Sequence, residues 1–172
     1  MEKVKLQIYT GEGKGKTSSA IGLCIRALAY NNKIYFLQFL KFRETGEEKT
    51  FKSLKNITFK KFGINEFIIN NKITDKNKKI IRKGIDYLFN VLDTKKINIL
   101  VLDEINLVYF YKIITKKEIN NIIKICNKKN IELILTGRFA HKDLIKKADL
   151  VTEFKEIKHY YKNTKAREGI EY

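Results

Sequence analysis

Short apolar segments alternate with amphipathic ones along the chain, and each kind predicts a different element. Residues 97–102 and 131–135 are continuous apolar runs, which are typical of strands covered on both faces of a sheet. Residues 4–9 alternate apolar and polar positions and also predict a strand. Three more strands are predicted where β-branched and aromatic residues gather, over residues 33–39, 56–62 and 150–157.

Helices are predicted between these strands. Residues 74–93 carry one apolar face at helical spacing, made of Ile81, Ile85, Leu88 and Leu92. Thr115 and Glu118 have the spacing of a capping box and open a second amphipathic helix. Residues 16–30 leave almost no polar face, so we expect that helix to be well buried.

The remaining segments predict short or irregular structure. Residues 141–148 predict a short helix, and the polar segment 42–55 predicts a loop with another. Residues 63–73 have no clear period and predict a loop. Strands thus alternate with helices, which favours an α/β fold with a mostly parallel sheet and helices on both faces. The chain shows no repeat or linker, so we expect one domain over residues 1–172.

Charge adds a question about partners. Lys and Arg number 36 against 19 Asp and Glu, which gives a net charge of +17. Such a balance can indicate nucleic acid, a membrane surface or an anionic small substrate. The excess is mostly lysine spread along the chain, and proline is absent. We interpret it as a solvated surface and not as a dedicated nucleic-acid face.

Two features predict a cytosolic protein without a membrane span. The chain enters its first strand without a signal-peptide core, and no apolar run approaches the roughly 18 residues that a span needs. The cysteines Cys24 and Cys126 stand far apart, each within an apolar helical pattern. We expect them to be buried reduced thiols.

A glycine-rich loop joins the first strand to the first helix, in the context that a P-loop requires. Glycines let successive backbone N–H groups point at phosphate oxygens, and the helix N-terminus adds its positive end. Lys16 would supply a cation to the terminal phosphates, and Thr17 would offer a hydroxyl to Mg²⁺. The predicted nucleotide-binding residues are Gly11, Glu12, Gly13, Lys14, Gly15, Lys16, Thr17 and Ser18.

This loop is one residue shorter than the common P-loop. Thr10 stands where the first glycine of the common motif would be, and the glycine comes one place later, at Gly11. A shortened loop need not hold a triphosphate in the usual pose.

Polar residues at other strand ends complete the candidate site. Asp103 and Glu104 end an apolar strand, a Walker B pattern that predicts Mg²⁺ ligands. Gln38, which Lys41 and Arg43 follow, and Arg138 also come at strand ends, where open α/β sheets bind ligands. Arg138 would contact phosphate or lie in a solvated loop. His141 and His159 are not at metal-binding spacing, and we interpret them as structural or surface groups.

Together these motifs resemble the ATP:corrinoid adenosyltransferases of adenosylcobalamin formation. The stretch Tyr9-Thr10-Gly11-Glu12-Gly13-Lys14-Gly15-Lys16-Thr17 resembles their shortened P-loop. Gln38-Phe39-Leu40-Lys41, Thr45-Gly46-Glu47 and Leu102-Asp103-Glu104 follow as further signatures. Leu135-Thr136-Gly137-Arg138, Ala148-Asp149-Leu150-Val151-Thr152-Glu153, Ile157-Lys158-His159 and Gly169-Ile170-Glu171-Tyr172 extend the resemblance to residue 172.

The resemblance implies a RecA-like fold, a homodimer and a reaction. A Co(I) corrinoid would attack C5′ of ATP, form a Co–C bond and release triphosphate, with a reductase supplying Co(I). Lys16 and Thr17 would be the catalytic residues, and Thr17, Asp103 and Glu104 the Mg²⁺ side. The resemblance does not say which corrinoid is the natural substrate.

Two departures from the family concern the corrinoid. Members often carry an N-terminal extension over the active site, whereas this sequence starts at the first strand. Some members also use a Phe and a Trp to displace the lower cobalt ligand, and this sequence has no Trp. Phe62 and Phe67 are candidates to replace them, with core packing as the alternative.

Two other functions stay open on the sequence. A nucleic-acid-stimulated P-loop ATPase would explain the net charge and the Asp-Glu pair, although the shortened loop does not favour it. A non-catalytic carrier would bind a corrinoid without releasing triphosphate.

Overall fold

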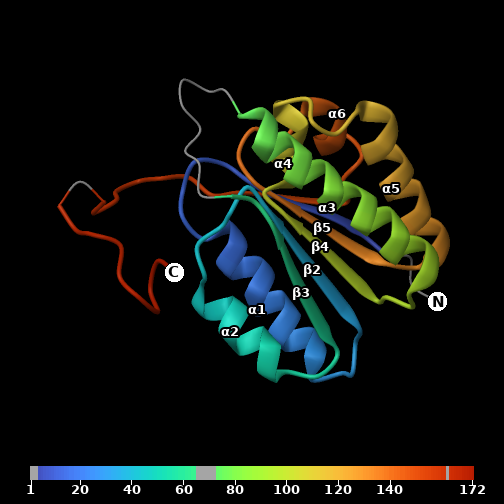
Figure 1. Ribbon diagram of the computed structural model, residues 1–172, viewed down its shortest axis with the longest axis horizontal. Helices are drawn as coiled ribbons and strands as arrows, with labels where there is room; N and C mark the ends of the chain where they lie inside the picture. Colours follow the sequence, from blue (N-terminus) through green and yellow to red (C-terminus); the bar gives the residue numbers. More distant parts are fainter. Residues whose placement is uncertain (1–3, 65–72, 162) are drawn as a thin grey trace.

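Parallel strands form one six-stranded sheet in the computed structural model, which describes residues 4–64, 73–161 and 163–172 (Figure 1). Across the sheet the strands follow the order β3-β2-β4-β5-β1-β6, and each pairs in parallel with its neighbours. Their bounds are Leu6–Thr10 for β1, Ile34–Phe39 for β2, Ile57–Phe62 for β3, Ile99–Asp103 for β4, Glu132–Thr136 for β5 and Leu150–Glu153 for β6. The predicted parallel α/β sheet is confirmed.

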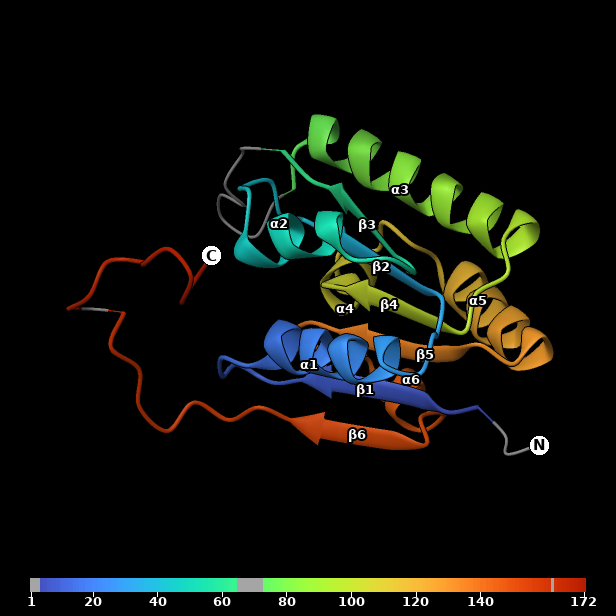
Figure 2. The same ribbon diagram turned by 90° about the horizontal axis from the view of Figure 1, so that it is seen from below.

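Helices cover both faces of this sheet (Figure 2). Side chains alternate along β4, so that Leu100 and Leu102 pack into one core cluster while Ile99 and Val101 pack into the other. The second cluster lies under α1 (Lys16–Leu28) and α2 (Gly46–Ser53). The first lies under α3 (Asp75–Thr94), α4 (Ile105–Phe110), α5 (Lys116–Lys129) and α6 (Lys142–Ile145).

Three features differ from the sequence prediction. The short helix α4 was not predicted, and the last strand ends at Glu153 instead of continuing to residue 157. The expected burial of the first helix was wrong, because α1 meets the sheet through a narrow stripe that includes Ala20 and Cys24. Ile25 is 46% exposed, so this helix keeps apolar surface open to solvent. In the described part of the chain, no helix is both long and apolar enough to cross a membrane.

The parallel arrangement brings all the strand ends that carry candidate residues to one edge of the sheet. The register sets Gln38 directly beside Asp103 on the neighbouring strand. Leu102 is paired with Leu135, so Thr136 comes next to Asp103 from the other side. Sheet register therefore places three polar side chains together without any contribution from loops.

The predicted capping box of α5 is confirmed and forms part of an ion pair. The Thr115 side chain accepts the Glu118 N–H, and the Glu118 carboxylate accepts the Thr115 N–H at 2.8 Å. Arg82 of α3 donates to the same carboxylate at 2.8 Å. The Arg82 bond, with those from Thr115, lowers the pKa of Glu118 to about 2. The box thereby fixes α5 against α3.

This ion pair predicts a pH dependence of stability. The folded pKa of Glu118 lies below the ordinary carboxylate value, so its contribution is present above that value and is lost as pH falls toward about 2. The pair is partly exposed, so the expected contribution is below about 1 kcal/mol. Denaturant unfolding at pH 6 and near pH 2 should show a smaller acid loss for Glu118→Gln than for the wild type. Equal losses would contradict the assignment.

Candidate active site

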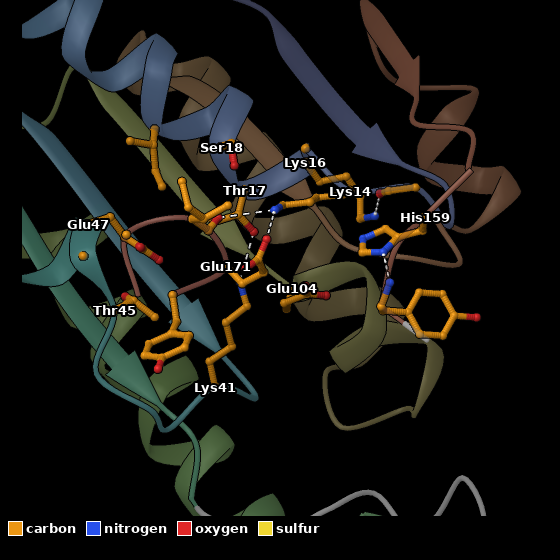
Figure 3. A pocket seen from close by; sticks show the side chains of 18 of the residues that line it. Lys14, Lys16, Thr17, Ser18, Lys41, Thr45, Glu47, Glu104, His159 and Glu171 are labelled. Atoms are coloured by element: carbon orange, nitrogen blue, oxygen red, sulfur yellow. Dashed lines mark hydrogen bonds and ion pairs between the residues drawn. The ribbon is translucent and has the colours of Figure 1, made fainter. Parts of the chain in front are cut away.

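A cavity of about 1210 Å³ lies at the carboxyl edge of the sheet. It is lined by the glycine-rich loop, the first turns of α1, Lys41, the start of α2, Glu104 and the C-terminal segment. Figure 3 shows Lys16 and Thr17 of α1, Lys41 after β2 and Glu104 after β4 around this space. The cavity collects residues 12–18, Arg138 and Glu104 of the predicted site, while Asp103 is fully buried and does not line it.

Lys16 is held by the loop that precedes it. Its ammonium group donates to the carbonyl oxygens of Gly11 and Gly13, both at 2.7 Å. Gly15, which precedes α1, has a φ of 122°, a conformation that a residue with a Cβ rarely adopts. Burial lowers the pKa of Lys16. The lysine is thus kept beside the loop at the N-terminal end of a helix, where anions bind.

The C-terminal segment crosses directly over this loop. The Gly13 N–H donates to the Phe154 carbonyl at 2.7 Å, and the Phe154 N–H donates to the Thr10 carbonyl at 2.8 Å. A Cβ on Gly11 or Gly13 would come within 2.8 Å or less of the Phe154 carbonyl oxygen. The first two glycines of the loop are therefore required by this crossing as well as by any phosphate.

Two glycine-to-alanine substitutions should show whether a loss of stability comes from this crossing or from any added methyl group in the region. Gly13→Ala would push its methyl into the backbone of residues 154 and 155, so we expect a stability loss of about 1–3 kcal/mol. Gly22→Ala is the control, because it lies exposed on α1 with no atom near the added Cβ. It should stabilise by roughly 0.5–1 kcal/mol through helix propensity. Urea unfolding of both variants is the measurement, and a neutral Gly13→Ala would contradict the close approach.

Four side chains donate hydrogen bonds to Asp103. It is fully buried. One carboxylate oxygen accepts the hydroxyls of Thr17 at 2.9 Å and Thr136 at 2.6 Å. The other accepts the Gln38 amide at 2.9 Å and the Lys41 ammonium at 3.0 Å. Asp103 thus joins the glycine-rich loop to the ends of β2, β4 and β5.

The neighbouring Glu104 has a different environment. Its backbone is left-handed, with a φ of 63°, and its N–H donates to the Thr136 hydroxyl at 3.0 Å. Among the described residues, its buried Oε2 has no hydrogen-bond partner. A buried carboxylate oxygen without a donor is costly unless a ligand satisfies it. Glu104 thus lines the cavity and carries one buried oxygen, beside Gly137, that no group among the described residues satisfies.

The titration of these groups follows from burial and proximity. Burial and then the charge of Asp103 raise the pKa of Glu104. Burial alone would raise the pKa of Asp103, but the charge of Lys41 and the hydrogen bonds from Thr136, Gln38 and Lys41 outweigh burial and lower this pKa. Burial likewise opposes the charge of Lys41, but Asp103 and Glu104 outweigh it and raise its pKa. At neutral pH the site thus contains an ionised Asp103 paired with a charged lysine.

A second link ties the C-terminal segment to the loop. Lys14 donates to the Glu171 carboxylate at 2.9 Å and to the Tyr160 hydroxyl at 3.3 Å. Arg167 donates to the same carboxylate at 3.3 Å and, with Tyr160 and Lys14, holds the pKa of Glu171 far below its usual range. Lys14, predicted for nucleotide binding, is therefore engaged with the tail at the margin of the cavity.

Of the other predicted site residues, three line the cavity and Gln38 lies behind it. Ser18, Glu12 and Arg138 line the cavity, and Glu12 pairs with Arg138 at 3.1 Å. Gln38 is completely buried behind Asp103 and supports that carboxylate without lining the cavity.

Of the two aromatic candidates for the corrinoid, Phe62 is not brought to the cavity. Phe62 stacks on Phe39 with ring centroids 5.7 Å apart and also packs on Tyr87, because Gly84 leaves room for its ring. Phe62 thus makes the core contacts given as its alternative role and does not line this cavity. Phe67 lies outside the described residues.

The histidines have local structural contacts. The Nδ1 atom of His141 accepts the Asp143 N–H at the start of α6, and that of His159 accepts the Tyr161 N–H. His159 also lines the cavity. Sequence reasoning named Lys41 and Thr136 within motifs but assigned neither of them a specific role at the site. Their signal was available, since both stand at or just after strand ends that flank Asp103.

Comparisons with known proteins agree over the whole chain. The family model described as "ATP:corrinoid adenosyltransferase BtuR/CobO/CobP" matches residues 2–172. A corrinoid adenosyltransferase of Sinorhizobium sp is 29% identical over 99% of this chain and 81% of its own length. One of Escherichia coli K12 is 26% identical over 96% and 84%. Among solved structures, the KaiC-like protein PH0186 of Pyrococcus horikoshii OT3 has a TM-score of 0.55 at 14% identity, covering 89% of this chain and 73% of its own. That likeness concerns the fold and supports the RecA-like expectation.

Proposed function

The chain belongs to the ATP:corrinoid adenosyltransferase family, and from this premise we propose that it transfers the 5′-deoxyadenosyl group of ATP to the cobalt of a Co(I) corrinoid. The observation that carries the proposal is that Lys16 and Thr17 line one cavity at the P-loop, where the Thr17 hydroxyl bonds the buried Asp103 carboxylate at 2.9 Å. These residues belong to two of the motif segments, the P-loop and the Walker B strand. ATP and the corrinoid are both substrates in this reaction.

The proposed chemistry needs little from the protein beyond binding and charge. The cobalt electron pair forms the Co–C5′ bond while the C5′–O bond breaks, and its electrons leave with the triphosphate. Co(I) is itself a strong nucleophile, so the reaction requires no activated side chain. Lys16 and the N–H groups of the loop would stabilise the charge on the departing triphosphate. Holding C5′ in line with cobalt could supply roughly 7–11 kcal/mol of the barrier.

The residues at the P-loop also fit Mg²⁺. Thr17 and Asp103 present a hydroxyl and a carboxylate 2.9 Å apart, and Glu104 adds an acceptor without a partner among the described residues. Hard oxygen ligands of this kind, few in number, are what Mg²⁺ takes when it binds with a nucleotide. Bound there, the ion would neutralise charge on the phosphates. We propose Thr17 and Asp103 as its holders, with Glu104 beside them.

The cellular setting belongs to the same proposal. Cys24 and Cys126 are buried unpaired thiols, which suits a reducing compartment such as the cytosol. A homodimer and a reductase that supplies Co(I) are proposed from the family resemblance alone. Light scattering of the purified protein would test the dimer.

An anaerobic assay tests the activity. Chemically reduced cob(I)alamin, Mg–ATP and the purified protein should lose the Co(I) spectrum and yield a light-sensitive Co–C product. Triphosphate should appear in equal amount. Heat-denatured protein and an assay without ATP are the controls.

The rival functions give different results in this assay. A carrier would bind the corrinoid without releasing triphosphate. An ATPase would release phosphate without forming a Co–C bond, faster with nucleic acid and with steep salt dependence. Either pattern would overturn the transferase proposal.

A further inference from the structure

Lys41 lies between the two groups proposed to hold Mg²⁺. Its ammonium donates to the Thr17 hydroxyl at 3.0 Å and to the Asp103 carboxylate at 3.0 Å. Thr17 and Asp103 also bond each other at 2.9 Å. Each of the three groups thus bonds the other two, in a triangle whose positive charge is the Lys41 ammonium. An ammonium group thus stands where the loop threonine and the Walker B carboxylate would share a metal ion.

The backbone that carries Lys41 is fixed by close packing. Leu40 has a left-handed φ of 61°, and its N–H donates to the Phe62 carbonyl at 3.0 Å. A Cβ on Gly63 would lie 2.5 Å from the Lys41 carbonyl oxygen, so the chain can pass there because that residue is glycine. This packing determines where the lysine side chain starts. The left-handed conformation of Leu40 is uncommon for a residue with a Cβ, and such conformations often occur at functional positions.

The side chain itself can leave the triangle. Lys41 lines the cavity and its side chain is 31% exposed, whereas Asp103 is fully buried. A lysine has a flexible stem of four carbons. Two cations cannot share the space between the same two oxygens, because their repulsion is strong at this distance. Lys41 must therefore move when a metal ion takes this position, and the cavity into which it can turn is the proposed triphosphate site.

We propose that Lys41 is a resident counter-ion that keeps Thr17 and Asp103 in binding geometry in the nucleotide-free protein. When Mg–ATP binds, the Lys41 ammonium moves to the nucleotide phosphates. It is a positioning residue for the metal-holding pair. This role rests on the proposed binding of Mg–ATP and goes beyond it, because it makes nucleotide and metal binding coupled events. Magnesium alone would have to displace Lys41 without offering the ammonium a phosphate.

Thermal melting without nucleotide tests this role directly. Wild-type protein should show no rise in melting temperature with MgCl₂ compared with the same ionic strength of KCl. Lys41→Gln removes the charge and keeps a hydrogen-bonding side chain, so magnesium alone should raise its melting temperature by roughly 2–4 °C at a few times the dissociation constant. Lys41→Arg keeps the charge and should respond like the wild type. Lys61→Gln is the matched control, because it removes the lysine paired with Glu48 at the end of β3, away from Thr17.

Each outcome decides the proposal. Stabilisation of the wild type by magnesium alone overturns it, and this measurement stands even where a variant fails to fold. A Lys41→Gln variant that ignores magnesium, or a Lys61→Gln variant that responds equally, also overturns it. None of these readings depends on adenosyl transfer. Failure of the transferase proposal would instead appear as absent Co–C product with the melting pattern intact.

Discussion

Replacing Lys16 by alanine should lower the turnover number for adenosyl transfer by about 10²–10³-fold, the usual effect of removing one preorganised donor from a developing negative charge. The ammonium of Lys16 is already held beside the loop by the Gly11 and Gly13 carbonyls. Little reorganisation is needed for it to meet a phosphate. Single-turnover kinetics with saturating Mg–ATP would separate this effect from weaker binding.

Two other lysines serve as controls for this substitution. Lys14→Ala removes a charge from the same loop, but that ammonium is engaged with Glu171 and Tyr160. We expect its effect to be less than about tenfold. Lys33→Ala removes an exposed lysine at the opposite end of β2 and should be neutral. Near-normal turnover of Lys16→Ala, with the protein folded, would place the triphosphate elsewhere.

Replacing Asp103 by alanine should cost about 3 kcal/mol of folding free energy, in the range found when one partner of a buried ion pair is removed. The change leaves the Gln38 amide and the Thr136 hydroxyl without their acceptor in the interior. Lys41 can still turn toward water, which keeps the expected loss at the lower end. Urea unfolding of the nucleotide-free protein is the measurement.

Glu104→Gln is the matched control for Asp103. It removes the adjacent carboxylate, whose pKa is raised by burial and by Asp103, and whose Oε2 has no partner in the described part of the chain. A neutral amide there removes repulsion and burial cost, so stability should stay equal or rise at neutral pH. Equal losses in the two variants would contradict the central role given to Asp103.

Much of the fold and site could be predicted because the signals were local or periodic. The apolar run before Asp103 predicted a covered strand, and the glycine-rich loop predicted the turn into α1. Parallel strands then bring Gln38, Asp103 and Thr136 to one edge without further information. The capping box at Thr115 was also a local signal with a direct physical meaning.

The features that the sequence did not predict depend on contacts between distant segments. The composition of α1 predicted burial, but burial depends on what covers the helix, and Ile25 is left exposed. The ring of Phe62 lies where Gly84 makes space for it, which no pattern around residue 62 reveals. The triangle of Thr17, Lys41 and Asp103 joins three separate segments. The spacing of residues within one segment carries no information about contacts between side chains of separate segments.

The position of β1 inside the sheet has a consequence for synthesis on the ribosome. Its partners are β5 and β6, so the bonds at Lys5 and Leu6 span 127 and 143 residues. Strands β2, β3 and β4 can pair earlier, while β1 keeps unpaired edges until late in translation. The nascent chain therefore cannot assemble a phosphate-binding loop until Phe154 has emerged to cross it. Nucleotide affinity should appear late, as a sign that the C-terminal strands have docked.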